Sequence, residues 1–147
     1  MKYFEDFVSE GIIKKTSINK SKAKFLIEET ERTSRSLFKR IEALGIDDDN
    51  ANSITKDCYD IIMELIRATL QLSGYSSSGA YAHEAEISFL RKLKFSESEI
   101  VFINDLRINR NGITYYGKIL NKDDAERIVS FTKKTYPKLK KLVIEKI

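Results

Sequence analysis

Residues 54–72, ITKDCYDIIMELIRATLQL, carry apolar side chains on a stripe so wide that a helix formed by them must be covered from several sides. Apolar residues, or the small Thr69, stand at positions 54, 58, 61, 62, 65, 66, 69, 70 and 72. Such a stripe is typical of the central helix of a bundle. Gly74 predicts the end of this helix, and the DDDN run at 47–50 supplies side chains that can cap its start.

Few helix breakers interrupt the rest of the chain, which holds one proline and six glycines. Its many Lys, Glu, Leu and Ile residues favour helix. Ser21 can cap one helix, and Ser96 with Glu99 forms the capping-box pattern of another. We expect helices within 2–11, from Ser21 to Gly45, within 54–72, over about 80–93, over 96–120 and from about Lys122 onward, with 12–19 as an extended linker.

No stretch alternates apolar and polar residues with the period of two that marks a strand. We therefore predict an all-α fold, an antiparallel up-and-down bundle of about five to six helices, in a single domain spanning 1–147. Asn121 is expected to begin the last helix, and Pro137 is expected to kink or break it.

The composition is that of a folded domain, with 41% hydrophobic and 33% charged residues in a chain of 147. Cys58 is the only cysteine, so no internal disulfide can form, and its helical setting predicts a buried thiol. The formal net charge of +4 permits a nucleic-acid partner without requiring one. We see no signal-peptide pattern and no apolar run of membrane length, so we expect a cytoplasmic protein with no membrane partner.

The usual signatures of catalysis do not occur. There is no glycine-rich phosphate loop and no Cys or His cluster with metal-ligand spacing, so we expect neither a metal nor a cofactor. His83, in AYAHEAEISFL, is the only histidine, and its position in a helix beside Glu84 and Glu86 favours a structural or surface role.

The stretch DLRINRNGITYYGK at 105–118 is unusual for a helix. On a helical wheel Arg110 falls at the edge of the core face, while Ile108, Tyr115 and Ile119 share a second, partly apolar face. That second face predicts contact with another helix, a second copy of the chain or a ligand. Gly112 costs about 1 kcal/mol relative to alanine inside a helix, which predicts a close backbone approach or a bend there.

Three segments resemble the HEPN superfamily of small all-helical domains, in particular its archaeal members. FVSEGIIKKTSINKSKAKFLIEETERTSRSLFKRI resembles the family's opening, and GYSSSGAYAHEAEISFL resembles its middle. LRINRNGITYYG is similar to the family motif Arg-Asn-x-x-x-His, with Arg110 and Asn111 on its first two positions and Tyr115 in the histidine slot.

The resemblance implies a homodimer in which two copies of the 96–120 helix meet and form a composite cleft. Active members of the family are metal-independent ribonucleases, in which the arginine holds the scissile phosphate and the histidine handles the proton of the ribose 2′-hydroxyl. Arg110, Asn111 and Tyr115 are therefore the candidate catalytic residues. Arg107 and Lys118, the cations beside them, are the candidate nucleic-acid contacts.

A tyrosine side chain ordinarily has a pKa near 10, so only about a thousandth of it is ionised at pH 7. We therefore expect an RNA- or nucleotide-binding dimer with a degenerate ribonuclease motif rather than an enzyme. One alternative is an active ribonuclease toxin neutralised by a nucleotidyltransferase-type partner protein. Another is a purely structural dimerisation module.

In that structural alternative, Arg110 is a half-buried arginine paired with a carboxylate, for which Asp57, Asp60 and Glu84 are the candidates. Tyr115 and its neighbour Tyr116 then serve only in packing.

Overall fold

The computed structural model describes residues 2–147 and is 74% helical, which confirms the all-α prediction. Four long helices form the bundle: α2 (Lys20–Leu44), α3 (Ala51–Leu72), α5 (Glu97–Tyr116) and α6 (Lys122–Lys146). Shorter elements complete the fold: α1 (Phe4–Ser9), β1 (Ile13–Lys15), β2 (Tyr75–Ser77), α4 (Ala82–Ser88) and the 3-10 turn η1 (Phe89–Arg91). Within residues 2–147, no helix has the length and apolar character needed to cross a membrane.

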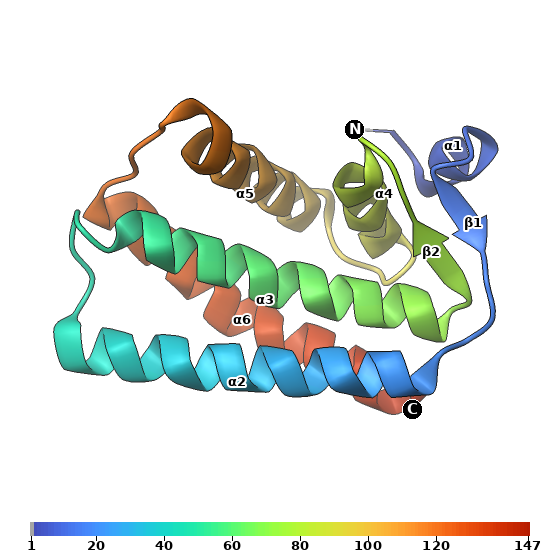
Figure 1. Cartoon of the computed structure of the whole chain (residues 1–147), viewed down its shortest axis with the longest axis horizontal. Helices are drawn as coiled ribbons and strands as arrows, with labels where there is room; N and C mark the ends of the chain where they lie inside the picture. The colour runs from blue at the N-terminus through green and yellow to red at the C-terminus, as the bar shows by residue number, and fades with distance from the viewer. Residues whose placement is uncertain (1) are drawn as a thin grey trace.

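The central element is α3, as its wide apolar stripe predicts. Of its 22 residues 14 are buried, and it packs against α2, α4, α5 and α6 (Figure 1). Cys58 lies in this core as predicted, and burial raises the pKa of its thiol to about 11.

The direction of the helices follows from their connections. α2 and α3 run antiparallel, as do α5 and α6, while α6 runs in the same direction as α3 (Figure 1). α6 can run in the same direction as α3 because α4, η1 and α5 come between the two helices in the sequence and lead the chain back. This path leaves α4 and α5 side by side along one flank of α3, where the candidate site is formed.

A small antiparallel sheet was not predicted. Ile13 pairs with Ser77 and Lys15 with Tyr75, so β1 lies in the segment that we expected to be a linker. Its strands have three residues each, which is too short for alternation to be visible in the sequence. Ile13 is buried in a satellite cluster with Phe4, Phe7, Leu70, Ala85 and Phe89.

Several predicted helix boundaries are corrected. Asn19, not Ser21, caps α2, because its side chain accepts the N–H of Lys22 at 2.9 Å. The helix expected over 80–93 is the shorter α4 followed by η1. α5 ends at Tyr116 because Gly117 adopts a left-handed φ of 68°, so Ile119 lies beyond the helix that we predicted to reach 120.

The last helix does not break at Pro137. α6 continues to Lys146, and its buried side presents Thr132, Thr135, Leu139 and Val143 towards the core. Pro137 itself is exposed. A proline removes one helical N–H, and at an exposed position water can satisfy the carbonyl that loses this donor.

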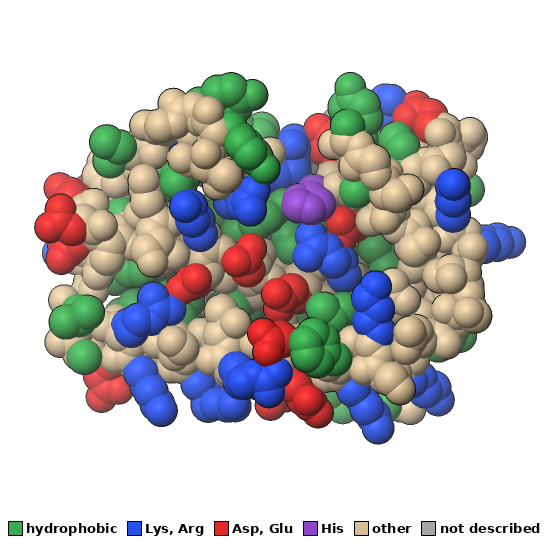
Figure 2. Space-filling view, in the orientation of Figure 1, with side chains coloured by type: hydrophobic (Ala, Val, Ile, Leu, Met, Phe, Trp, Pro, Cys, Tyr) green, Lys and Arg blue, Asp and Glu red, His purple; other side chains and the backbone are tan. Residues whose placement is uncertain are grey.

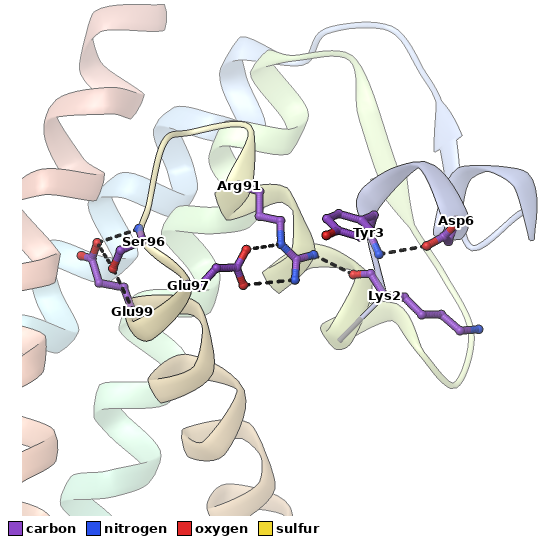
Figure 3. A network of polar contacts seen from close by, with 7 residues as sticks. All are labelled: Lys2, Tyr3, Asp6, Arg91, Ser96, Glu97 and Glu99. Atoms are coloured by element: carbon purple, nitrogen blue, oxygen red, sulfur yellow. Dashed lines mark hydrogen bonds and ion pairs between the residues drawn. The ribbon is translucent and has the colours of Figure 1, made fainter.

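Arg91 joins the N-terminal segment to the start of α5. Its Nε donates to Glu97 Oε1 at 2.7 Å and its Nη1 to the carbonyl of Lys2 at 2.9 Å (Figure 3). Next to it, Ser96 and Glu99 form the predicted capping box, in which the side chain of each accepts the backbone N–H of the other. These contacts set where α5 begins relative to α4.

Candidate functional site

A hollow of about 340 Å³ lies between α4 and α5. We call it the Arg110 hollow. Figure 2 shows the histidine side chain in a notch of the surface between these two helices, with basic side chains beside it. The hollow is lined by residues 79–84 and, from α5, by Arg107, Arg110, Asn111 and Tyr115. Four of the five predicted site residues therefore meet in one place.

Arg110 is half-buried, as expected, and its guanidinium carbon lies 5.7 Å from the centre of the Tyr59 ring. The expected carboxylate partner is missing, because no acidic side chain of residues 2–147 comes within ion-pair distance of Arg110. Asp57 pairs with Arg40 instead, and Glu84 pairs with Arg107. The only hydrogen bond to its guanidinium from the described residues is a long one of 3.5 Å to Asn111 Oδ1.

The third expected partner, Asp60, interacts with Arg110 only at longer range. Burial raises the pKa of this carboxyl, and the charge of Arg110 opposes the rise. The positive charge of Arg110 is therefore incompletely balanced within the fold, and it faces the hollow.

Arg107, by contrast, forms hydrogen bonds within the wall of the hollow. Its Nη2 donates to Glu84 Oε1 at 2.9 Å and its Nε to Asn104 Oδ1 at 3.0 Å. Its side chain is only 17% exposed. These bonds hold α5 against α4 and leave Arg107 less available than Arg110 to an incoming anion.

Two tyrosines stand on opposite rims of the hollow. Tyr115, in the last turn of α5, is 67% exposed, and Tyr81, just before α4, is 61% exposed. Tyr115 was predicted from the sequence and Tyr81 was not, because nothing in the local pattern brings residue 81 to α5. Each ring presents an apolar surface to solvent beside Arg110, which has no carboxylate within ion-pair distance among the described residues.

Lys118, the fifth predicted residue, does not line the hollow. Its Nζ donates to Asn109 Oδ1 at 2.6 Å, and its stem folds over Gly112. A Cβ added at Gly112 would lie 3.0 Å from Lys118 Cδ, so the predicted close approach comes from this side chain and not from a second backbone. The glycine belongs to the end of α5, where its carbonyl accepts the N–H groups of Gly117 and Lys118.

The sequence predicts a structural or surface role for His83, yet its side chain lines the Arg110 hollow. Its Nδ1 lies 2.8 Å from Tyr59 Oη, and its Nε2 lies 3.0 Å from Arg67 Nη2. A guanidinium can only donate, so Nε2 accepts, and the ring proton lies on Nδ1 and is donated to Tyr59. This network identifies the neutral imidazole and its tautomer.

The surroundings of His83 also keep it neutral. Burial lowers the pKa of its imidazole, and the charges of Arg67, Arg110 and Arg107 lower it further. Burial likewise raises the pKa of the Tyr59 hydroxyl to about 12. With both ring nitrogens engaged, His83 has no free lone pair with which to take a proton from a ligand.

What the arrangement can do is hold an anion. Among residues 2–147 no group of three or more His, Cys, Asp or Glu side chains is placed to hold a metal ion. Comparisons with family models, with curated proteins and with solved structures give no match for this chain.

Proposed function

We propose that the chain is a HEPN-like domain that binds single-stranded RNA in the Arg110 hollow, without appreciable cleavage. The observation that carries this proposal is the half-buried guanidinium of Arg110, which faces a hollow of about 340 Å³ without a carboxylate partner among the described residues. A phosphate is the natural partner of such a group, because a guanidinium donates two parallel hydrogen bonds to its oxygens. The amide of Asn111 beside it adds a further donor.

The exposed rings of Tyr81 and Tyr115 favour a single strand over an isolated phosphate. Bases that are not paired can stack on aromatic side chains, and such stacking is tolerant of sequence. A phosphate on Arg110 with its flanking bases on the two rims uses both the guanidinium and the exposed rings. A duplex, whose bases are already stacked, would leave both rings exposed.

Cleavage is not expected from these residues. Tyr115 stands where the resembled family has its histidine, and a phenol is a poor base at neutral pH. His83 is near enough to contribute, but Arg67 and Tyr59 occupy its two ring nitrogens. The hollow therefore has a phosphate-binding group without an available base.

The decisive experiment measures the affinity for a fluorescently labelled single-stranded RNA by anisotropy, in chelator and at two salt concentrations. Arg110→Ala should weaken binding about ten-fold, as expected for loss of a hydrogen bond to a charged group. It should also reduce the salt dependence, because one phosphate contact fewer releases fewer counterions. The matched control is Arg35→Ala, which removes the same charge from an exposed arginine of α2.

Equal effects of Arg110→Ala and Arg35→Ala would refute binding in this hollow. No measurable RNA binding by the wild-type protein would favour the structural dimerisation module instead.

Metal-independent cleavage is a second candidate, favoured by the presence of an imidazole in the same hollow as Arg110. A ligand that drew Arg67 away would free His83 Nε2 to act as a base. The same RNA, incubated in chelator and analysed for cyclic phosphate ends, tests this. Cleavage that disappears in both Arg110→Ala and His83→Gln would establish the enzyme and make a nucleotidyltransferase-type partner protein worth seeking.

We further propose a homodimer through α5. Val101 and Ile108 are both more than half exposed and stand seven residues apart on α5, which is the spacing of a seam between two helices. Ile108→Glu places a charge in this seam and should weaken association at least ten-fold in sedimentation, whereas Ser130→Glu on the exposed side of α6 should not. A wild-type protein that is monomeric at micromolar concentration would contradict the dimer.

A further inference from the structure

The positive charge of the chain is concentrated in one short segment. Residues 11–27, GIIKKTSINKSKAKFLI, contain five lysines and no acidic residue. The whole chain has a formal net charge of +4, so the residues outside this segment sum to −1. We call the five side chains the lysine patch: Lys14, Lys15, Lys20, Lys22 and Lys24, all of them exposed. Figure 2 shows basic side chains along the lower right edge of the molecule, where β1 and the first turns of α2 lie.

The lysine patch has no carboxylate of residues 2–147 within ion-pair distance. The acidic side chains on either side of the segment and at the end of α6 pair with other cations: Glu10 with Lys2, Glu29 with Arg32, Glu31 with Lys140 and Glu145 with Lys141. Glu28 is exposed and offsets one of the five positive charges at longer range. The patch therefore keeps a clear positive excess.

Two of these lysines also stand where a helix disfavours them. Lys20 and Lys22 lie in the first turn of α2, which contains no acidic residue. The positive end of the helix dipole repels cations at this position. Because no ion pair compensates for this repulsion, helix stability does not explain the lysines.

The lysine patch borders a second hollow, of about 420 Å³, between the first turns of α2, the last turns of α3, β2 and α4. We call it the Arg67 hollow. Lys22 stands in its wall, and His83 lines both this hollow and the Arg110 hollow.

The Arg67 hollow itself adds no positive excess. Arg67 Nε donates to Glu86 Oε2 at 2.6 Å, which balances the charge of the guanidinium. Asp60 and Glu64 of α3 interact with the same arginine at longer range. The excess on this side of the molecule therefore belongs to the exposed lysines and not to the hollow behind them.

Apolar side chains are exposed among the lysines. Ile18 and Phe25, before and within α2, are both more than half exposed. Ile144 of α6 is exposed to the same degree and lies beside α2, because Lys140, one helical turn earlier, pairs with Glu31. Figure 1 shows the end of α6 next to the start of α2. Basic and apolar groups therefore share one end of the bundle.

We infer that the lysine patch, together with Ile18, Phe25 and Ile144, binds the surface of a membrane that contains anionic phospholipids. The ammonium groups pair with the charged headgroups, and the apolar side chains enter the boundary between headgroups and acyl chains. An uncharged bilayer would leave the lysines without partners. A nucleic-acid strand would leave the aliphatic side chains in water, and the segment has no arginine for bidentate contacts to phosphate.

The expected lack of a membrane partner rests on the absence of an apolar run of membrane length, so it concerns insertion and not binding at the surface. The lysine patch lies on β1 and α2, whereas the Arg110 hollow lies between α4 and α5. Membrane binding is therefore independent of RNA binding in that hollow, and Arg110→Ala should leave it unchanged.

Co-sedimentation with vesicles tests the inference. The wild-type protein should bind vesicles of equal parts phosphatidylcholine and phosphatidylserine but not vesicles of phosphatidylcholine alone, and added salt should weaken the binding. Lys20→Gln with Lys24→Gln should weaken it roughly twenty-five-fold, about five-fold for each lysine at an anionic surface. Phe25→Ser should weaken it about ten-fold, through loss of apolar contact.

The matched controls alter the other end of the bundle. Lys39→Gln with Lys56→Gln removes two exposed lysines from the last turns of α2 and the start of α3. Leu44→Ser removes an exposed apolar side chain at the end of α2. Both should bind vesicles as the wild type does, and circular dichroism of each variant shows whether the helices are retained.

Three results would overturn the inference. The first is that the wild-type protein binds neither kind of vesicle or binds both equally. The second is that the variants at the patch bind as the controls do. The third is that single-stranded RNA binding is lost in Lys20→Gln with Lys24→Gln but kept in Arg110→Ala, which would make the patch an RNA surface and also contradict the proposed function of the Arg110 hollow.

Discussion

The two hollows that meet at His83 treat their arginines in opposite ways. Arg67 is bound to a carboxylate that is 1% exposed, whereas Arg110 has no carboxylate within ion-pair distance among residues 2–147 and rests on the ring of Tyr59. A buried ion pair holds elements together, because either partner alone would be a buried charge. The charge of a half-buried arginine without such a partner remains available to pair with a ligand. Burial alone therefore does not distinguish a structural arginine from a functional one; the partner does.

The aromatic groups of the two hollows differ in the same way. Tyr75 lines the Arg67 hollow, but its ring packs against Phe4, with ring centres 5.1 Å apart, and against Phe89. Tyr81 and Tyr115 at the Arg110 hollow are mostly exposed. One hollow is thus walled by side chains that support the fold, and the other is rimmed by side chains that the fold does not use.

The largest expected effect is on stability. Arg67→Ala leaves Glu86 buried without its partner and should lower the free energy of unfolding by about 3 kcal/mol. Arg110→Ala removes a ring contact and one long hydrogen bond, and it should lower the free energy of unfolding by less than about 1 kcal/mol. Urea denaturation of both variants measures the difference, and equal losses would break the distinction drawn between the two arginines.

The next effect concerns the rims of the Arg110 hollow. Tyr81→Ala and Tyr115→Ala should each weaken binding of single-stranded RNA about ten-fold, within the range for one stacked base. Tyr81→Phe and Tyr115→Phe keep the ring and should bind nearly as well as the wild type. If both alanine variants bind normally while Arg110→Ala does not, the phosphate contact stands and base stacking is refuted.

A smaller effect is expected from pH on RNA binding. His83 is neutral in the free protein because burial and three arginines lower its pKa. A bound phosphate would raise that pKa again, and Nε2 would then take up a proton in place of the one that it accepts from Arg67. Binding should therefore take up a proton, so RNA affinity should rise a few-fold as the pH falls from about 7.5 to 5.5. His83→Gln keeps a donor and an acceptor for Tyr59 and Arg67 but cannot titrate, and it should lose this dependence. A wild-type affinity that stays constant over this range would exclude His83 from the binding site.

The smallest effect is on stability as a function of pH. The imidazole pKa is lower in the folded than in the unfolded chain, so below about pH 6.5 the unfolded chain binds more protons and stability falls. The slope for one group is at most about 1.4 kcal/mol per pH unit. Glu64 and Glu86, whose pKa values burial raises, change stability in the opposite sense. Urea denaturation of wild type and His83→Gln at several pH values isolates the contribution of the histidine to the free energy of unfolding. If this free energy depends on pH identically in the two proteins, the surroundings of His83 do not shift its pKa.

Local chemistry explains which parts of the fold could be predicted. The stripe of α3, the capping box at Ser96 and the cap at Asn121 are determined by residues within a few positions of one another, and all are found in the structure. The predicted end of α5 at residue 120 was wrong. Gly112 and Gly117 together form the end of this helix, whereas the helical wheel assumes that both lie inside it. The strands were missed because their pairing joins segments about sixty residues apart, with only three residues in each.

The sequence by itself determined that Arg110, Asn111 and Tyr115 lie near one another, because they fall within two turns of one helix. Only the tertiary structure decided what surrounds them. The packing of α3, α4 and α5 brought His83, Tyr81 and Tyr59 to Arg110, and it assigned Asp57 to Arg40 and Glu84 to Arg107. Whether a charge is balanced depends on side chains far apart in the chain that compete for the same partner. No local pattern records the outcome of that competition, so the free arginine could be recognised only in the folded molecule.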